Sequence, residues 1–310
     1  MKFQWKIILA FSAVYIIWGS TYLAILWVIT EIPPLLMSGI RFMAAGIILF
    51  GWCMWKREKL PGYSSFVKNS VCGILMLFGG TGAVAWSEQY IPSGLAAVIV
   101  TTVPFWFILL DKKKWSFYFS NKLIIPGLLL GFAGVLLLAG FDTKLSLNHN
   151  DISKVALGIF VIIAGGVAWT AGSLFSKYKP AGNSVFMNAA IQLIVAGFFS
   201  VIVSVFSGET RNFSFSVVQA SGWFALLYLV TAGSLIAYLC YLWLLKVRPA
   251  AQVSSYVYVN PVVAVLLGAL FAGEKISLLQ IVSLALILVG VLLVNTPKYK
   301  TTGTPQLSAT

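Results

Sequence analysis

Two charged side chains of opposite sign stand inside long apolar stretches of this 310-residue chain, and they are the first candidates for binding chemistry. Arg41 lies on the order of 10 Å into the apolar run that follows Pro33 and Pro34, since a helix rises about 1.5 Å per residue. An ion at that depth costs about 2.5–3.5 kcal/mol and must face a partner or a water-filled cavity. Arg41 therefore either anchors a carboxylate or other anionic group, or is a snorkelling cation or part of a structural ion pair.

Glu88 is the only acidic residue that the pattern embeds, four positions before Pro92 in the third apolar run. Counting along the runs places it on the same, extracellular side as Arg41. It could bind a substrate amine, carry a coupling proton, or pair with Arg41. Asp111 and Glu274 stand at the ends of runs beside lysines, and we expect both to be solvated.

Four tryptophans occupy related positions in the two halves of the chain, and none stands at the extreme end of its apolar run. Tryptophan in a membrane protein is usually an anchor at the lipid–water interface. Polar residues share helical faces with two of these rings, so we expect the four either to line a cavity or to pack between helices. The tryptophans are Trp18, Trp86, Trp169 and Trp243, and their polar neighbours are Thr21, Tyr22 and Ser173.

Polar stripes run along three later apolar runs, where an unpaired amide or hydroxyl in lipid would be costly. Residues four apart share one face of a helix, so each stripe faces either a cavity or a hydrogen-bonding neighbour helix. The stripes are Ser184, Asn188 and Gln192; Ser234, Tyr238 and Tyr241; and Ser254, Ser255 and Tyr258.

Two prolines and one glycine pair predict local helix geometry. Pro104 and Pro261 fall within their runs, where proline removes a backbone hydrogen bond and kinks the helix. Each could serve gating, or could be a bend for packing alone. Gly127 and Gly131 form Gly-x-x-x-Gly, which predicts close helix packing within the protomer or a contact between protomers.

Nothing in the sequence is typical of a metal site, a cofactor site or a catalytic nucleophile. The three cysteines, Cys53, Cys72 and Cys240, lie in or beside apolar runs without paired spacing, and His149 is the single histidine. A phosphate-binding Gly-x-x-x-x-Gly-Lys-Ser/Thr loop is also missing, so we predict no ATP hydrolysis by this chain. We expect no enzyme activity and no cofactor.

The elements that must position these residues are membrane helices. The chain is 60% hydrophobic and 9% charged with a mean hydropathy of +0.94, whereas a soluble domain carries about 25% charged residues. This excludes a cytosolic enzyme, a secreted domain and a nucleic-acid-binding module. Ten apolar runs are long enough to span a bilayer, namely 7–29, 34–54, 70–90, 93–110, 123–141, 155–175, 184–206, 219–243, 250–271 and 278–295.

The basic residues predict the orientation. Alternate gaps between runs hold 16 and 4 of the lysines and arginines, and the richer set includes both ends of the chain. Cytoplasmic loops carry the excess of positive charge, so both termini are expected in the cytoplasm, with residues 297–310 forming a disordered tail. This asymmetry also explains the net charge of +13 without nucleic acid.

The two halves repeat. Trp86, Pro92 and Pro104 recur as Trp243, Pro249 and Pro261, each 157 positions later. Five spans in each half is an odd number, so the second half must be inserted upside down. Inverted repeats with a site at their interface are typical of secondary transporters. The predicted domains are residues 1–145 and 154–296.

Short motifs spread over residues 7–295 resemble the EamA family of the drug/metabolite transporter superfamily. The matching pieces are Trp18-Gly19-Ser20-Thr21-Tyr22, Pro33-Pro34, Arg41-Phe42, Ala44-Ala45, Thr102-Val103-Pro104, Ala168-Trp169, Gly172-Ser173, Tyr258-Val259-Asn260-Pro261 and Gly273-Glu274. The resemblance implies an all-α fold of ten helices, built as two inverted five-helix repeats around a central cavity. It also implies a place in the bacterial inner membrane and the export of amino acids or related metabolites.

Together these features predict a secondary transporter, an exporter or a facilitator, that works by alternating access. Its partners would be a small-molecule substrate, the lipid bilayer and a coupling ion such as the proton, with the chain a monomer or a weak homo-oligomer. In this hypothesis Arg41 receives a carboxylate, Glu88 an amine or a proton, and the aromatic residues the side chain. A multidrug or lipophilic-cation exporter of the same fold is the alternative.

Overall fold

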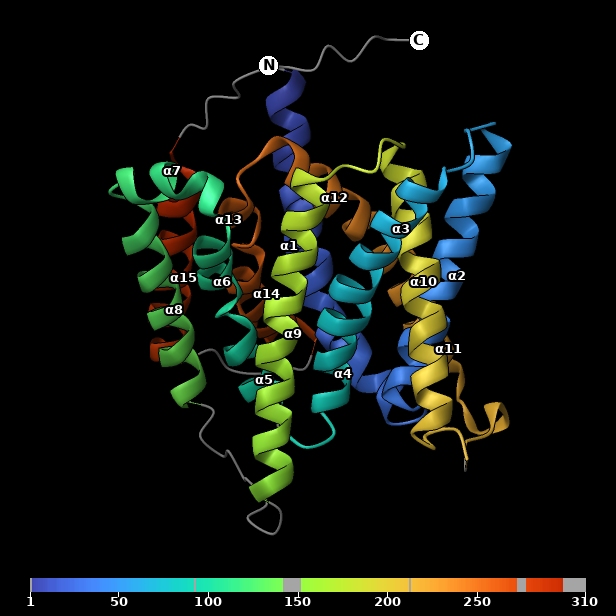
Figure 1. The fold of residues 1–310 in the computed structure, drawn as a ribbon. Helices are drawn as coiled ribbons and strands as arrows, with labels where there is room; N and C mark the ends of the chain where they lie inside the picture. Colours follow the sequence, from blue (N-terminus) through green and yellow to red (C-terminus); the bar gives the residue numbers. More distant parts are fainter. Residues whose placement is uncertain (1, 92, 142–151, 212, 272–276, 298–310) are drawn as a thin grey trace.

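The computed structural model is a bundle of helices (Figure 1) and describes all residues except 1, 92, 142–151, 212, 272–276 and 298–310. His149, Pro92, Glu274 and the tail lie outside the described residues. Within the described ranges every regular element is helical. The helices are α1 (Lys2–Ile29), α2 (Pro34–Trp55), α3 (Tyr63–Cys72), η1 (Gly73–Gly82), α4 (Ala83–Ser87), α5 (Ser93–Val100), α6 (Val103–Leu110), η2 (Lys112–Lys114), α7 (Trp115–Ser120), α8 (Ile124–Phe141), α9 (Ile152–Tyr178), α10 (Val185–Phe206), η4 (Phe215–Val217), α11 (Ala220–Tyr228), η5 (Leu229–Ala237), α12 (Tyr238–Val247), α13 (Ala250–Val253), α14 (Tyr256–Phe271) and α15 (Leu278–Asn295).

Seven helical stretches among the described residues are long and apolar enough to cross a membrane. They are 34–55, 63–87, 152–178, 185–206, 220–247, 250–267 and 278–295, and an eighth is counted if the bent pair 112–120 and 124–138 forms one span. The backbone of such a helix needs no water in the membrane, because its N–H and C=O groups bond to each other within the helix. The chain is therefore an all-helical protein built for a lipid environment.

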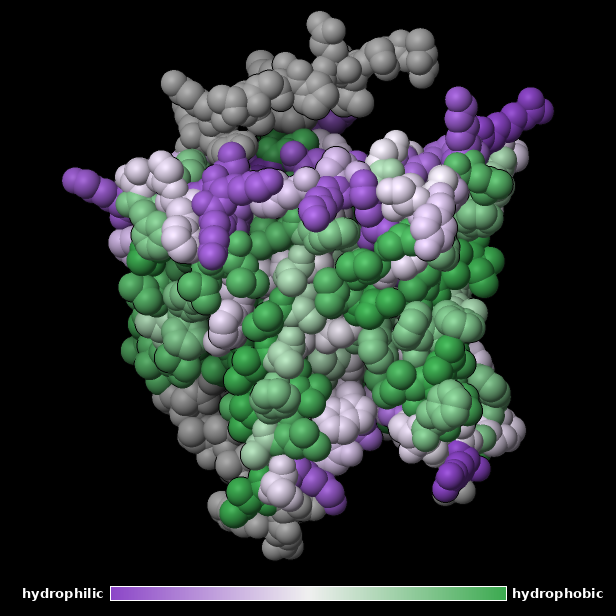
Figure 2. Space-filling model, in the orientation of Figure 1, coloured by the Kyte–Doolittle hydropathy of each residue, from purple (hydrophilic) through white to green (hydrophobic). Residues whose placement is uncertain are grey.

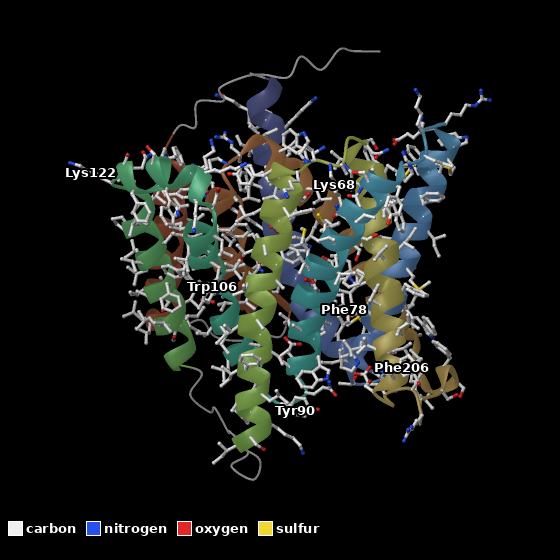
Figure 3. The ribbon with its side chains drawn as sticks, in the orientation of Figure 1. Lys68, Phe78, Tyr90, Trp106, Lys122 and Phe206 are labelled. Atoms are coloured by element: carbon white, nitrogen blue, oxygen red, sulfur yellow. The ribbon has the colours of Figure 1, made fainter. Side chains whose placement is uncertain are left out.

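Polar surface gathers at the two ends of the bundle, and a green apolar band lies between them (Figure 2). Helix α1 begins and α15 ends at the same end (Figure 1), where Lys68 and Lys122 also lie (Figure 3). We call this the lysine-rich end. Tyr90 and Phe206 lie at the opposite end, and helices α1 and α9 run in opposite directions between the two.

Two of the spans contain long π-helical segments. Residues 63–87 are α-helical except over η1, and residues 220–247 are α-helical except over η5. π-Helical turns frequently occur at functional sites, because they widen the helix and shift the direction of its side chains. These two segments occupy corresponding positions, since each precedes one of the repeat-related residues Trp86 and Trp243.

The predicted proline kinks have different local structures. Residues 93–110 form α5 and α6 with a break at Thr101 and Thr102, and Pro104 stands in the first turn of α6, where its missing N–H costs nothing. Pro261 lies inside α14, and the break in this stretch falls earlier, at Ser254 and Ser255.

Glycines allow α8 and α15 to pack closely within one protomer. A Cβ atom at Gly127 would lie 2.8 Å from the carbonyl oxygen of Gly290, and one at Gly290 would lie 2.6 Å from the backbone nitrogen of Gly131. The Gly-x-x-x-Gly motif is thus used in a helix pair of the same chain.

Candidate functional site

A cavity of about 110 Å³ lies at the centre of the helix bundle. Its walls come from α1, α2, η1, α4, α5, α6, α9, η5, α12 and α14, so helices of both halves enclose it. The residues of α1 that line it belong to the second half of that helix, and those of α9 to its first two thirds. The cavity therefore extends from the middle of the bundle toward the end opposite the lysines, where Figure 2 shows an indented surface.

Arg41 is the single charged residue among the described residues that line this cavity. Its side chain is 5% exposed, and its Nε donates a hydrogen bond to Oγ of Ser234 at 2.8 Å. The terminal Nη2 atom lies close to Gly233 of the same segment, η5, because a Cβ atom on Gly233 would approach it to 2.8 Å. Gly233 thus makes room for the guanidinium, whose terminal nitrogens are suited to a bidentate anion.

Four aromatic rings cluster beside the cavity toward its lysine-rich side. The ring centroids of Trp18 and Trp169 are 5.6 Å apart, and Trp18 also lies 5.1 Å from Tyr241 and 4.7 Å from Tyr256. Tilted and edge-on arrangements at such distances are the favourable ones for aromatic pairs. Nε1 of Trp18 donates to the carbonyl oxygen of Gly233 at 3.1 Å, which fixes the ring between the two halves.

The amide stripe of α10 joins a hydrogen-bonded network outside the cavity lining. Nδ2 of Asn69 donates to Oδ1 of Asn188 at 2.8 Å, and Nε2 of Gln192 donates to Oδ1 of Asn69 at 2.9 Å. The hydroxyl of Tyr238 donates to Oε1 of Gln192 and itself lines the cavity. Of the two roles open for this stripe, the geometry corresponds to hydrogen bonding between helices, and only Tyr238 connects it with the cavity.

Three further candidate residues are buried behind the cavity wall. Ser173 hydrogen-bonds with the hydroxyl of Tyr241 at 2.8 Å, and Ser255 hydrogen-bonds with the hydroxyl of Tyr15 at 2.7 Å. Tyr258 packs against Gly131 of α8, and no described residue forms a hydrogen bond with its buried hydroxyl. These residues support the lining and do not belong to it.

The remaining candidates lie elsewhere. Trp86 packs against Tyr90, with ring centroids 4.9 Å apart, and Glu88 follows the end of α4 as a half-buried residue outside the lining. Trp243 packs against the main hydrophobic core from α12. Tyr22 belongs to α1, but its side chain lies outside the described ones.

Several lining residues were not among the predicted site residues, namely Thr81, Ser234, Tyr256 and Asn260 and the glycines Gly80, Gly165, Gly166 and Gly233. Ser234 shares the polar stripe with Tyr238 and Tyr241, and Asn260 directly precedes Pro261, so both had a signal in the sequence. The glycines had none, because a small residue that opens a cavity has the same pattern as one that packs two helices.

A buried cluster of hydrogen bonds, here called the Asp111 cluster, lies near the lysine-rich end. Asp111 is 1% exposed and accepts hydrogen bonds from the hydroxyls of Tyr118 and Tyr178, each at 2.6 Å. Lys177 donates to the backbone carbonyls of Leu245 and Arg248 at the end of α12. The expectation that Asp111 is solvated was wrong, because a tyrosine seven residues later and one 67 residues later both turn toward its carboxylate.

No group of three or more histidine, cysteine or acidic side chains that could hold a metal ion occurs in the described part of the chain. The described lining of the cavity contains one cation, hydroxyl groups, an amide and aromatic rings.

Comparison with known proteins shows the family to which this chain is similar. The model of the EamA-like transporter family matches residues 4–140 and again 156–296. The chain is 36% identical over 293 residues to the uncharacterized inner membrane transporter YedA of Escherichia coli (strain K12), which covers 94% of this chain and 90% of that protein.

More distant proteins are similar over the same length. The chain is 26% identical over 301 residues to the uncharacterized transporter YvbV of Bacillus subtilis (strain 168), across 95% of this chain and 92% of that protein. A crystal structure described only as that of a protein matches 93% of this chain and 96% of its own chain with a TM-score of 0.74 and 18% identity, which shows a shared fold.

Proposed function

This chain belongs to the EamA-like transporter family, and we propose that it is a secondary transporter of small carboxylate-bearing metabolites, amino acids or related compounds, in a bacterial inner membrane. The relatives named as transporters match it over nearly their whole length, and one of them is named an inner membrane protein. The proposed mechanism is alternating access to the central cavity.

Helix directions and pairings support an inverted repeat of two five-helix halves. Helices α1 and α9 begin the two matched regions and run in opposite directions (Figure 1). Helix α2 packs on α10 and α8 packs on α15, so each pair joins elements with the same rank in the two halves. Binding at the interface of such repeats is typical of secondary transporters.

The lysine-rich end is the proposed cytoplasmic side, because positive charge is retained there. Helix α1 begins and helix α15 ends there (Figure 1). The cavity then lies toward the outside, while the Asp111 cluster and the four aromatic rings close the cytoplasmic side. In alternating access the contacts of Tyr118 and Tyr178 with Asp111 would break when the cavity opens inward.

One observation carries the substrate proposal: Arg41 is buried in the cavity wall and no other described lining residue is charged. A buried cation without an anionic partner is costly. A substrate carboxylate would supply that partner and bind the terminal nitrogens in the bidentate geometry that guanidinium favours. Aromatic walls would receive the apolar part of the substrate.

A lipophilic-cation exporter remains the second candidate, because stacked aromatic residues also attract cations. It would make Glu88 more important than Arg41. The charge of the lining favours an anionic metabolite, since Arg41 is the single charged residue among the described lining residues.

Counterflow into liposomes tests the two candidates. Purified protein is reconstituted with a mixture of unlabelled amino acids inside, and uptake of labelled tryptophan, threonine and glutamate is followed with and without a pH gradient. Counterflow that Arg41→Ala abolishes supports the carboxylate site, and a dependence on the gradient supports proton coupling. Movement of a lipophilic cation that survives Arg41→Ala and fails in Glu88→Gln, without amino acid counterflow, supports the cation exporter.

A further inference from the structure

Asn260 is a second polar residue in the lining of the cavity that contains Arg41. The residue lies on α14 and lines the cavity, and its side chain is 4% exposed. Its Oδ1 atom is buried, and it has no hydrogen-bond partner among the described residues. A buried carbonyl oxygen without a donor is unfavourable, so a ligand that brings a hydrogen-bond donor would satisfy it.

The cavity thus offers two separate kinds of contact to one ligand. Arg41 on α2 offers a positive charge and the N–H groups of its terminal nitrogens, while its Nε donates to Ser234. Asn260 offers a neutral acceptor from a helix of the other half of the chain. A ligand that contacts both would bridge the two halves.

Charge decides which ligand satisfies this pair best. Arg41 is the only charge among the described lining residues, so a bound monoanion makes the site neutral. An amino acid adds an ammonium group as well, and the lining offers that group no carboxylate. Taking an ammonium out of water without an acidic partner is costly, and contact with aromatic faces returns only part of that cost. A neutral hydroxyl can donate to Asn260 without this penalty.

We propose that the preferred ligand is a small organic monoanion with a neutral hydrogen-bond donor next to its carboxylate, such as a 2-hydroxy acid with an aromatic side chain. This inference rests on the proposed transport function and specifies the substrate class. The carboxylate binds Arg41, the hydroxyl donates to Asn260, and the side chain packs against Trp18, Trp169 and Tyr256. All five residues line the one cavity.

The test compares pairs of acids that differ only in the group at the second carbon. Counterflow of labelled phenyllactate is measured against phenylalanine, and of indole-3-lactate against tryptophan, in liposomes at neutral pH with protein-free liposomes as the blank. We expect a KM for each hydroxy acid at least about tenfold lower than that for its amino acid, so the hydroxy acid would bind about ten times more tightly.

Asn260→Asp adds a negative charge to the lining with almost no change in the size of the side chain. Its carboxylate would pair with the ammonium group of an amino acid. A hydroxy acid has no cation to balance this added negative charge. We expect the preference to shift toward the amino acids by at least about tenfold. Asn121→Asp is the matched control, because Asn121 lies between α7 and α8, outside the cavity lining. Thermal unfolding of each variant verifies that it is folded.

The outcomes separate the inference from the function on which it rests. Transport of amino acids with no advantage for hydroxy acids overturns the inference and leaves the transporter of small carboxylates in place. An unchanged preference in folded Asn260→Asp also overturns it. Movement of neither kind of acid by folded protein overturns both.

Discussion

Nε of Arg41 donates a hydrogen bond to Oγ of Ser234 over 2.8 Å, and this contact joins the first half of the chain to the second inside the central cavity. Arg41 comes from α2 and Ser234 from the π-helical segment η5. The bond uses the Nε edge of the guanidinium, so Ser234 orients the group that we propose as the substrate anchor.

Replacement of Arg41 measures the value of that anchor. Because charge-assisted hydrogen bonds contribute about 1.5–3 kcal/mol, Arg41→Ala should raise the KM for a carboxylate substrate about 10- to 100-fold. Arg41→Lys should recover part of the affinity, since lysine keeps the charge but not the bidentate geometry. Counterflow at a series of substrate concentrations gives the KM values. Wild-type KM in folded Arg41→Ala would refute the carboxylate site.

A methyl group at Gly233 should displace the guanidinium without removing its charge. The added Cβ in Gly233→Ala would lie 2.8 Å from Nη2 of Arg41 and 3.2 Å from Cγ2 of Thr21, so the end of the flexible arginine side chain must move. We expect a KM raised about tenfold or less, with an almost unchanged melting temperature. Gly51→Ala is the control, because a Cβ at Gly51 meets nothing within 4 Å. Equal KM values for the two variants would contradict this positioning role.

The Asp111 cluster should stabilise the structure with its lysine-rich end closed. Tyr178→Phe removes one of the two hydroxyls that bond Asp111, and leaving a buried carboxylate partly unsatisfied costs about 1–3 kcal/mol. The expected result is a lower melting temperature. Tyr63→Phe is the control, because Tyr63 is 85% exposed. If both variants melt like the wild type, the cluster does not hold this end.

The glycine contact between α8 and α15 should tolerate no side chain. Gly290→Ala would place a Cβ atom 2.6 Å from both the carbonyl oxygen of Gly127 and the backbone nitrogen of Gly131. Backbone atoms cannot rotate away, so the helices must separate at a cost of about 1–3 kcal/mol. Thermal unfolding in detergent should show a clear loss relative to Gly62→Ala, whose Cβ meets nothing within 4 Å. Equal unfolding temperatures would argue against this packing.

The sequence alone determined the class of protein and the residues that required an explanation. Hydropathy along the chain reports where lipid can surround a helix, so the apolar stretches and the uneven distribution of lysines could be read without a structure. The motifs around Trp18 and Arg41 indicated the family that the comparison then showed. The cost of burying a cation indicated that Arg41 must face either a partner or a cavity, and the structure places it in the cavity lining.

The tertiary structure alone decided which polar residues meet each other and which meet the cavity. Gln192 and Asn260 are both buried amides in apolar helices, yet Gln192 bonds with Asn69 and Tyr238, whereas the Oδ1 atom of Asn260 has no hydrogen-bond partner within the described part of the chain. Asp111 stands beside lysines in the sequence, but it is buried and accepts a hydrogen bond from the hydroxyl of Tyr178. Hydrophobic periodicity indicates that a polar face must be turned away from lipid, but the group it then faces is set by residues from distant parts of the chain.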